Sequence, residues 1–340
     1  AATGAYAPVA APIGGGKLVV AYKDSTTVKG QAKVGTIDSS TNTISFGSSS
    51  EFVSGGSGFD HSTVGYAGTD TVAIAYRDAN NSYHGYVRIA SVDTSANTIT
   101  LGTPVNIGLF NTECISTTYD TWNDKLILTY RNTLSSDRGE VIAGHVSGVG
   151  VTFGPAAPAQ FDGNSGIVVT STTFDSTNGK IVIAFQDGGS PYPCQAIVGF
   201  VTTNNAVSLG SSVEFVSATT APPTSDITTV YDSTNKRVCI TYMGTDTYGK
   251  AISGTVSGDT ISFGSTINYA GSVFCSGESS VYDSTNDKVV ISYKNESSVN
   301  GSAVVLSTKS SATNLTSENY IGIAAETISD TSTGKVNVIG

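Results

Sequence analysis

The sequence predicts an all-β chain, a β-propeller with six blades of four antiparallel strands each. Three observations favour this fold. An apolar segment of five residues that ends in an aromatic residue occurs six times, at intervals of 51 to 57 residues, a period typical of propeller blades. Turn residues separate shorter apolar segments between these copies. Charged residues make up only 13% of the chain and glycine supplies 38 positions, a composition that suits short strands and tight turns better than long helices.

The repeated segment predicts the second strand of each blade. Nearly all of its positions are apolar, as expected of a strand that neighbouring sheets cover on both faces, whereas a strand of an open sandwich alternates. A linear β-solenoid is the alternative architecture, but its coils are shorter and it leaves two ends to be capped. The six copies are residues 18–22, 72–76, 126–130, 181–185, 238–242 and 289–293.

The other strands of each blade are predicted from the residues around this segment. A first strand precedes it and ends in a hairpin turn of Asp, Ser and Asn, as in Phe174-Asp-Ser-Thr-Asn178. A third strand of small residues opens on glycine, as in Gly85-Tyr-Val-Arg-Ile89. A fourth strand ends in glycine, as in Thr43-Ile-Ser-Phe-Gly47. Six such units account for nearly the whole chain.

The predicted domain is residues 1–312, a six-bladed propeller. Residues 313–340 are expected either to close the ring with one or two strands or to begin a following module. Residues 326–340 align without gaps with residues 62–76, so a seven-bladed propeller with an incomplete blade is the alternative. The chain begins with Ala1 and its single methionine is Met243, which predicts a processed product or an excised piece.

These motifs resemble repeats in large virion structural proteins of tailed bacteriophages, particularly marine ones. The resemblance rests on the Tyr-x-Asp pattern, the glycine-opened strand, the Thr-Ile-Ser-Phe-Gly strand and the segment Asn314-Leu-Thr-Ser-Glu-Asn-Tyr-Ile-Gly322, because a similar stretch follows the propeller in such proteins. It covers the six predicted blades and the tail, although the first and fifth blades depart from the pattern. It implies a tail fibre or other virion appendage that recognises the host surface, and it assigns no catalytic or binding residue.

Candidate ligand-binding residues lie in the loops after the second strands and between blades. These loops differ among the six copies, whereas the turns of the opposite face are nearly identical, and variable loops are where a specific site is built. Aromatic rings beside polar groups suit a sugar, which offers C–H faces to the rings and hydroxyls to the polar groups. The alternative is that these rings only cover the tops of the blades. The candidates are Phe59, His61, Tyr83, His84, Phe110, Arg138, Tyr192 and Tyr248.

A polar residue lies two positions after the repeated aromatic residue in five of the copies. One metal ion could not collect these side chains, because they belong to separate blades and metal contacts are about 2.3–2.6 Å long. We expect each of them to cap the following turn. A cation held inside one loop, such as the loop around Asp137, is an open alternative, but no metal site and no cofactor is predicted. The five residues are Asp24, Asp78, Asn132, Asp187 and Asn295.

Catalytic motifs are scarce in the sequence. It has three histidines and no His-x-x-x-His, Gly-x-Ser-x-Gly or P-loop spacing. A glycosidase needs two carboxylates on one patch, and Asp60, Glu113 and Glu278 are the candidates for it. Such acids are common at any propeller opening, so we predict that the protein is not an enzyme.

The cysteines predict no disulfide scaffold, because their spacings are unpaired. Cys239 lies in the middle of a strand and is expected to be a small buried hydrophobe. The others are Cys114, Cys194 and Cys275.

Charge and hydropathy exclude two kinds of partner. The net charge is −10 with only 17 lysines and arginines, so nucleic acid is not an expected partner. No apolar run approaches the roughly 18 residues of a membrane span, so membrane insertion is not expected. We expect a binding module on a virion or other extracellular surface, with a host cell-surface glycan or receptor and other virion subunits as partners. A purely architectural module is the alternative.

Overall fold

The computed structural model describes residues 5–54, 59–154, 158–162, 166–217, 226–308, 321–324 and 336–339. These residues form antiparallel β-sheets and one short 3-10 turn, Thr133–Ser135, and they include no α-helix. The predicted all-β class is therefore confirmed. Nowhere in these ranges is there a helix with the length and apolar character of a membrane span.

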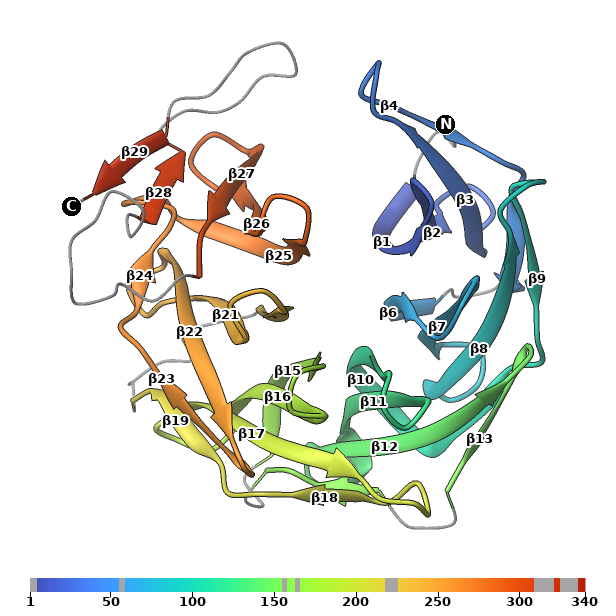
Figure 1. The fold of residues 1–340 in the computed structure, drawn as a ribbon. Helices are drawn as coiled ribbons and strands as arrows, with labels where there is room; N and C mark the ends of the chain where they lie inside the picture. The colour runs from blue at the N-terminus through green and yellow to red at the C-terminus, as the bar shows by residue number, and fades with distance from the viewer. Residues whose placement is uncertain are drawn as a thin grey trace. The chain divides into compact units, whose positions relative to one another are not determined.

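The chain divides into two compact units. The first comprises Ala1–Gly166 with Val201–Ser208, and the second comprises Ile167–Phe200 with Leu209–Gly340. Figure 1 labels the strands of both. One arrangement of strands repeats within each unit, and we call each repeat a module and number the modules in chain order.

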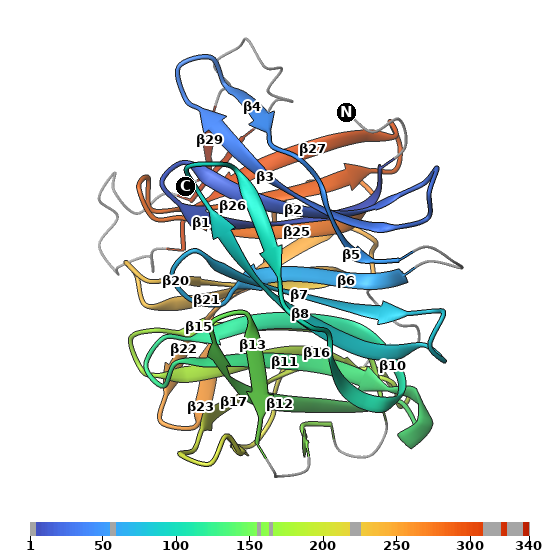
Figure 2. The ribbon, with the colours of Figure 1, turned by 90° about the vertical axis from the view of Figure 1, so that its right-hand side faces the viewer.

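Modules one to three belong to the first unit. In each, the first strand pairs with the second and the second with the third, all antiparallel, and Figure 2 shows β6, β7 and β8 side by side. Strand β10 serves two modules, because its first half pairs with β8 and its second half with β11. The strands are β1 (Ala5–Gly14), β2 (Lys17–Asp24), β3 (Gly30–Asp38), β4 (Thr43–Phe46) and β5 (Ser50–Val53), then β6 (Phe59–Tyr66), β7 (Thr71–Asp78), β8 (His84–Asp93) and β9 (Thr98–Leu101), then β10 (Val105–Asp120), β11 (Lys125–Asn132), β12 (Arg138–Ser147), β13 (Gly150–Phe153) and β14 (Ala159–Gln160).

Modules four to six belong to the second unit and repeat the same order. Module six has three strands among the described residues. Strand β18 (Val207–Leu209) lies at the boundary of the units, and β28 (Ile321–Ala324) pairs with β29 (Val336–Ile339). The assignment of residues 313–340 to ring closure or to a further module stays a prediction. The other strands are β15 (Ile167–Asp175), β16 (Lys180–Asp187), β17 (Cys194–Val201) and β19 (Val213–Val216), then β20 (Ile227–Asp232), β21 (Arg237–Met243), β22 (Gly249–Ser257), β23 (Thr260–Phe263) and β24 (Ile267–Asn268), then β25 (Cys275–Asp283), β26 (Lys288–Asn295) and β27 (Asn300–Leu306).

The second strands form the cores of the modules, as their sequence predicts. Ile74, Leu128, Ile183 and Ile240 have no exposed surface. In modules two and five, alternate side chains of the second strand pack on the preceding and on the following module, so that both faces of these strands are covered. Burial of two faces explains why the sequence does not alternate there.

The modules differ from the predicted blades in having an extra short strand. The fourth strand pairs with the second half of the third strand, and the chain then pairs again with the first half of the same strand. In module one these two strands are β4 and β5, which a glycine, Gly47, separates. Segments of two to four residues such as β14 and β24 are too short for a sequence pattern to reveal.

The hairpin turns between first and second strands are built as predicted. In module four the Asp175 carboxylate accepts hydrogen bonds from the backbone N–H groups of Thr177 and Asn178, at 2.9 and 3.0 Å, and from the Asn178 amide at 2.8 Å. The same aspartate-to-asparagine arrangement closes the turns at Asp120, Asp232 and Asp283.

Candidate functional site

The loops after the second strands begin with the predicted capping residues. The side chains of Asp24, Asp78, Asn132, Asp187 and Asn295 each accept a hydrogen bond from a backbone N–H two residues later, at 2.7–3.2 Å. The capping role predicted for them is confirmed. Within the described ranges, no three His, Cys, Asp or Glu side chains are grouped so that they could hold a metal ion.

Each of these loops ends with a residue in the left-handed backbone region, two positions before the start of the predicted third strand. We call it the display position of its module. Left-handed backbone is uncommon for residues other than glycine and unfavourable for β-branched ones, yet Val, Thr, Asp and Tyr all adopt it here. The loop geometry therefore imposes the conformation, and the side chain varies freely. The residues are Val28 (φ 58°), Tyr83 (60°), Asp137 (61°), Tyr192 (58°), Thr247 (66°) and Val299 (59°).

Tyr83 is the best-supported candidate among the display positions. Its carbonyl oxygen accepts a hydrogen bond from the Thr112 backbone N–H at 3.1 Å. The Arg77 guanidinium carbon lies 5.0 Å from the centre of the Tyr83 ring, a cation–π distance. The side chain is nevertheless 46% exposed. The ring is thus held from one side and open to solvent on the other.

A network of charges lies behind the Tyr83 ring. Arg77 Nη1 lies 2.6 Å from Glu113 Oε1 and donates to Asn111 Oδ1 at 3.2 Å. Arg131, which faces Glu113 across the β10–β11 ladder, binds the other oxygen of the same carboxylate, and its Nε lies 3.8 Å from Asp137 Oδ1. The Arg77, Glu113 and Arg131 side chains are only 11%, 18% and 24% exposed. Such a charge-assisted network fixes side chains in one arrangement.

The second unit carries an equivalent loop edge with different side chains. There the Thr247 carbonyl accepts from the Cys275 N–H at 3.3 Å, as Tyr83 does from Thr112, and Phe274 pairs with Tyr248 in an antiparallel bridge. Phe274 is 44% exposed. We call this the Tyr248–Phe274 edge. Lys250 lies beside it, 2.6 Å from Asp246 and 5.9 Å from the Tyr248 ring centre.

The predicted binding residues fall into three groups. The side chains of Phe59, His61 and Phe110 lie outside the described part of the structure. Tyr83 and Tyr192 occupy display positions, and the Tyr192 N–H donates to the Gly189 carbonyl at 2.7 Å. The others flank display positions: His84 and Tyr248 are half-buried, and Arg138 is exposed opposite Asn132 in its ladder.

Sequence reasoning missed Arg77, Arg131 and Asn111. Both arginines directly follow the repeated aromatic residue, in consecutive modules. The sequence signal that could have indicated them is an arginine directly after the repeated aromatic residue, together with an acidic residue, Glu113, in the first strand of module three.

Of the three carboxylates considered for glycosidase chemistry, the structure describes two, and these lie in different environments. The Asp60 side chain lies outside the described residues. Glu113 is neutralised between two guanidinium groups. Glu278 belongs to the second unit and is only 6% exposed.

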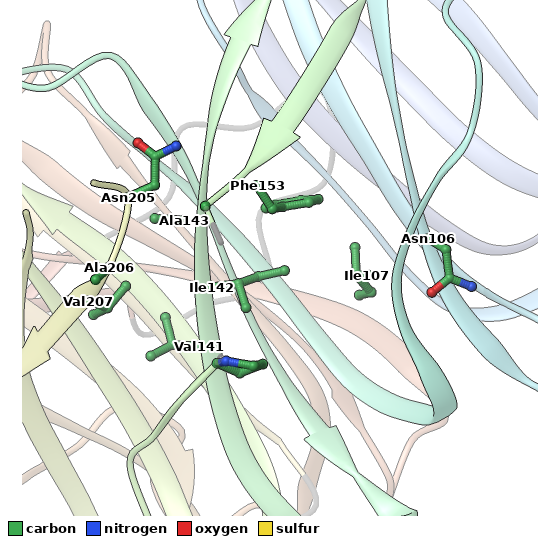
Figure 3. A pocket seen from close by; sticks show the side chains of 11 residues that line it. Asn106, Ile107, Val141, Ile142, Ala143, Phe153, Asn205, Ala206 and Val207 are labelled. Carbon is green, nitrogen blue, oxygen red and sulfur yellow. The ribbon is translucent and has the colours of Figure 1, made fainter. Parts of the chain in front are cut away.

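Figure 3 shows a small pocket beside β12 in the first unit. Its volume is about 160 Å³. Its lining includes Ile107, Val141, Ile142, Phe153 and Val207 and no charged side chain, and about half of its wall is polar. It is a gap in outer packing where β12 has neither β13 nor β14 beside it.

Cys239 is buried at 3% exposure, as predicted.

Comparison with known proteins gives the fold alone. No protein-family model and no curated protein matches the chain. Two solved structures are similar at 11% and 12% sequence identity: a candidate 6-phosphogluconolactonase from Bacteroides uniformis ATCC 8492 (TM-score 0.53, covering 87% of this chain and 83% of that one) and a protein of unknown function from Dyadobacter fermentans DSM 18053 (TM-score 0.54, covering 85% and 90%). The chain shares with them an all-β fold of repeated antiparallel sheets.

Proposed function

We propose that the protein is a β-propeller whose variable loops bind a glycan, and that it works on the surface of a virion or another extracellular particle without catalysing a reaction. The observation that carries the proposal is the Tyr83 ring. It is exposed to solvent, yet its backbone is hydrogen-bonded to Thr112 and its face contacts Arg77, which is itself fixed by an ion pair with Glu113. A rigid aromatic platform loses little entropy on binding and offers one face of a sugar ring its preferred contact.

The propeller is supported by the modules themselves and by two uncovered sheet faces. In module one, Ile44 is 48% exposed, whereas its equivalents Ile99 and Ile261 are 8% and 3% exposed under a neighbouring module. In module six, Ala303 is exposed where Ala32 of module one is buried. A closed ring would cover both of these faces, because every module would then have a neighbour on each side. A ring of six modules is proposed, with seven as the alternative.

The virion surface is proposed on the resemblance of the repeats and of residues 314–322 to bacteriophage virion proteins. A host glycan or receptor and other virion subunits are the partners that follow from it. An acidic, lysine-poor surface is suitable for a particle that must stay dispersed.

An architectural module is the second candidate. Under this reading, neighbouring subunits and not another module of the ring cover the apolar face of module one, where Ile37, Ile44 and Phe46 are 46%, 48% and 52% exposed. Patches of this kind mark contacts with other proteins.

Binding of the chain to an array of microbial glycans tests the proposal. We expect saturable binding that Tyr83→Ala abolishes. Tyr66→Ala is the matched control, because Tyr66 is a tyrosine of similar exposure, 40%, in the same unit but at the hairpin end of β6. If both variants still bind, Tyr83 is not part of the binding site. If the chain binds no glycan on the array, the architectural module becomes the favoured function.

A further inference from the structure

Glu278 is an acidic residue at a buried position of the second unit. It lies in β25 and is 6% exposed. Neither of its carboxylate oxygens has a well-formed hydrogen bond among the described residues. The equivalent position in module three, where Glu113 corresponds to Ser276, is the buried apolar residue Ile115.

The groups that face Glu278 come from several strands of the second unit. The backbone N–H of Glu278 itself favours the ionised carboxylate, the Asp226 carboxylate just before β20 disfavours it, and the Tyr269 hydroxyl just after β24 favours it more weakly. The Tyr269 ring lies 5.6 Å from the Tyr293 ring of β26, and Cys275 lies in β25 itself. Burial is the largest influence and raises the pKa of Glu278 to about 7.

Glu278 also lies at a bulge in β25. The strand pairing shifts between Ser276 and Ser279, and Gly277, at φ 63°, donates its N–H to Asp226 Oδ2 at 2.9 Å. The residues immediately before this bulge, Phe274 and Cys275, make the Tyr248–Phe274 edge. A group that loosens the bulge therefore acts on the edge.

We propose that Glu278 is a proton-operated latch: when neutral it stays buried and holds the start of β25, and when ionised it leaves and releases the Tyr248–Phe274 edge. An effect on glycan affinity rests on the proposed function, but the latch itself does not.

The sign follows from linkage. The closed state favours the protonated Glu278 carboxyl. The stabilisation of the closed state by this group is therefore fully present below the ordinary pKa of about 4.5. It decreases as the pH rises from 4.5 to 7 and is lost above 7.

No histidine of the second unit competes for this pH range. The three histidines, His61, His84 and His145, all belong to the first unit. Burial raises the pKa of Cys275 to about 11, and a hydrogen bond from Lys294 lowers the pKa of Glu296.

Hydrogen exchange of the whole chain without ligand tests the latch. After correction for intrinsic exchange, we expect amides 274–279 to lose about tenfold in protection between pH 6 and pH 8, because a group with a pKa of 7 closed and 4.5 open shifts the opening equilibrium by that factor. Glu278→Gln should abolish the loss, and Glu214→Gln, which removes an exposed acid of the same unit, should preserve it.

A carbon-13 titration of the Glu278 carboxyl in the unaltered chain covers the case in which Glu278→Gln folds poorly. Titration near 4.5 would overturn the latch, as would equal protection at both pH values or a loss that persists in Glu278→Gln. Because no glycan is present, failure here is separate from failure of the proposed function.

Discussion

Gly102 lies directly against the backbone carbonyl oxygen of Val149, and a Cβ atom added to Gly102 would stand 1.8 Å from that oxygen. Gly102 ends the fourth strand of module two, and Val149 belongs to the β12–β13 turn of module three. The same approach recurs between Gly47 and Asn97, at 2.2 Å, and between Gly210 and Asp259, at 2.0 Å. The glycine that ends the predicted fourth strand is thus the place where the next module's turn rests.

Gly102→Ala should destabilise the protein by about 3 kcal/mol, since a methyl group there collides with backbone that has no room to move. Urea unfolding measures the effect. Gly150→Ala is the control, because its nearest neighbour would be 3.6 Å away, and it should change the free energy of unfolding by less than about 1 kcal/mol.

Asp175→Ala should cost about 2–3 kcal/mol, because a buried carboxylate that binds three N–H donors is removed. Asp93 makes similar bonds in an exposed turn, so Asp93→Ala should lower the thermal unfolding midpoint much less than Asp175→Ala does. Equal thermal unfolding midpoints for the two variants would contradict the view that burial of a turn determines how much its hydrogen bonds stabilise the protein.

Glu113→Gln should destabilise the first unit by about 3 kcal/mol, because two poorly exposed guanidinium groups lose their counter-charge. Arg77→Met should cost much less in the Glu113→Gln background than alone. A double-mutant cycle measures this coupling, and additive costs would show that the ion pairs act independently.

Val299→Asn should stabilise the protein by about 1 kcal/mol. Val299 is 71% exposed and has a φ of 59°, so little packing is lost and a residue that tolerates left-handed backbone replaces one that does not. Val281→Asn is the comparison, since Val281 is 51% exposed but lies within β25, where asparagine is disfavoured. A fall in stability for Val299→Asn would refute the claim of backbone strain.

The parts of this fold that sequence predicts are those that local interactions determine. The apolar segment ending in Tyr76 and its copies, and the caps at Asp78 and Asn132, depend on neighbouring residues and are present as expected. The Arg77–Glu113–Arg131 network joins two modules, so its geometry depends on tertiary contacts. The left-handed Val28 and Val299 contradict the preferences of valine, and only the repeated spacing to the following glycine could have indicated them.

The display positions separate the shape of a loop from its side chain. The contacts that close the loop around Tyr83 and around Thr247 run through backbone N–H and carbonyl groups, which every residue except proline provides. Mutation can therefore exchange the exposed side chain at these positions without changing the loop's hydrogen bonds. The left-handed backbone is strained for many residues, but the loops already accept it at Val28 and Val299. A lineage can thus change the exposed groups by single codon changes, and a laboratory library randomised at these six codons would explore the same freedom.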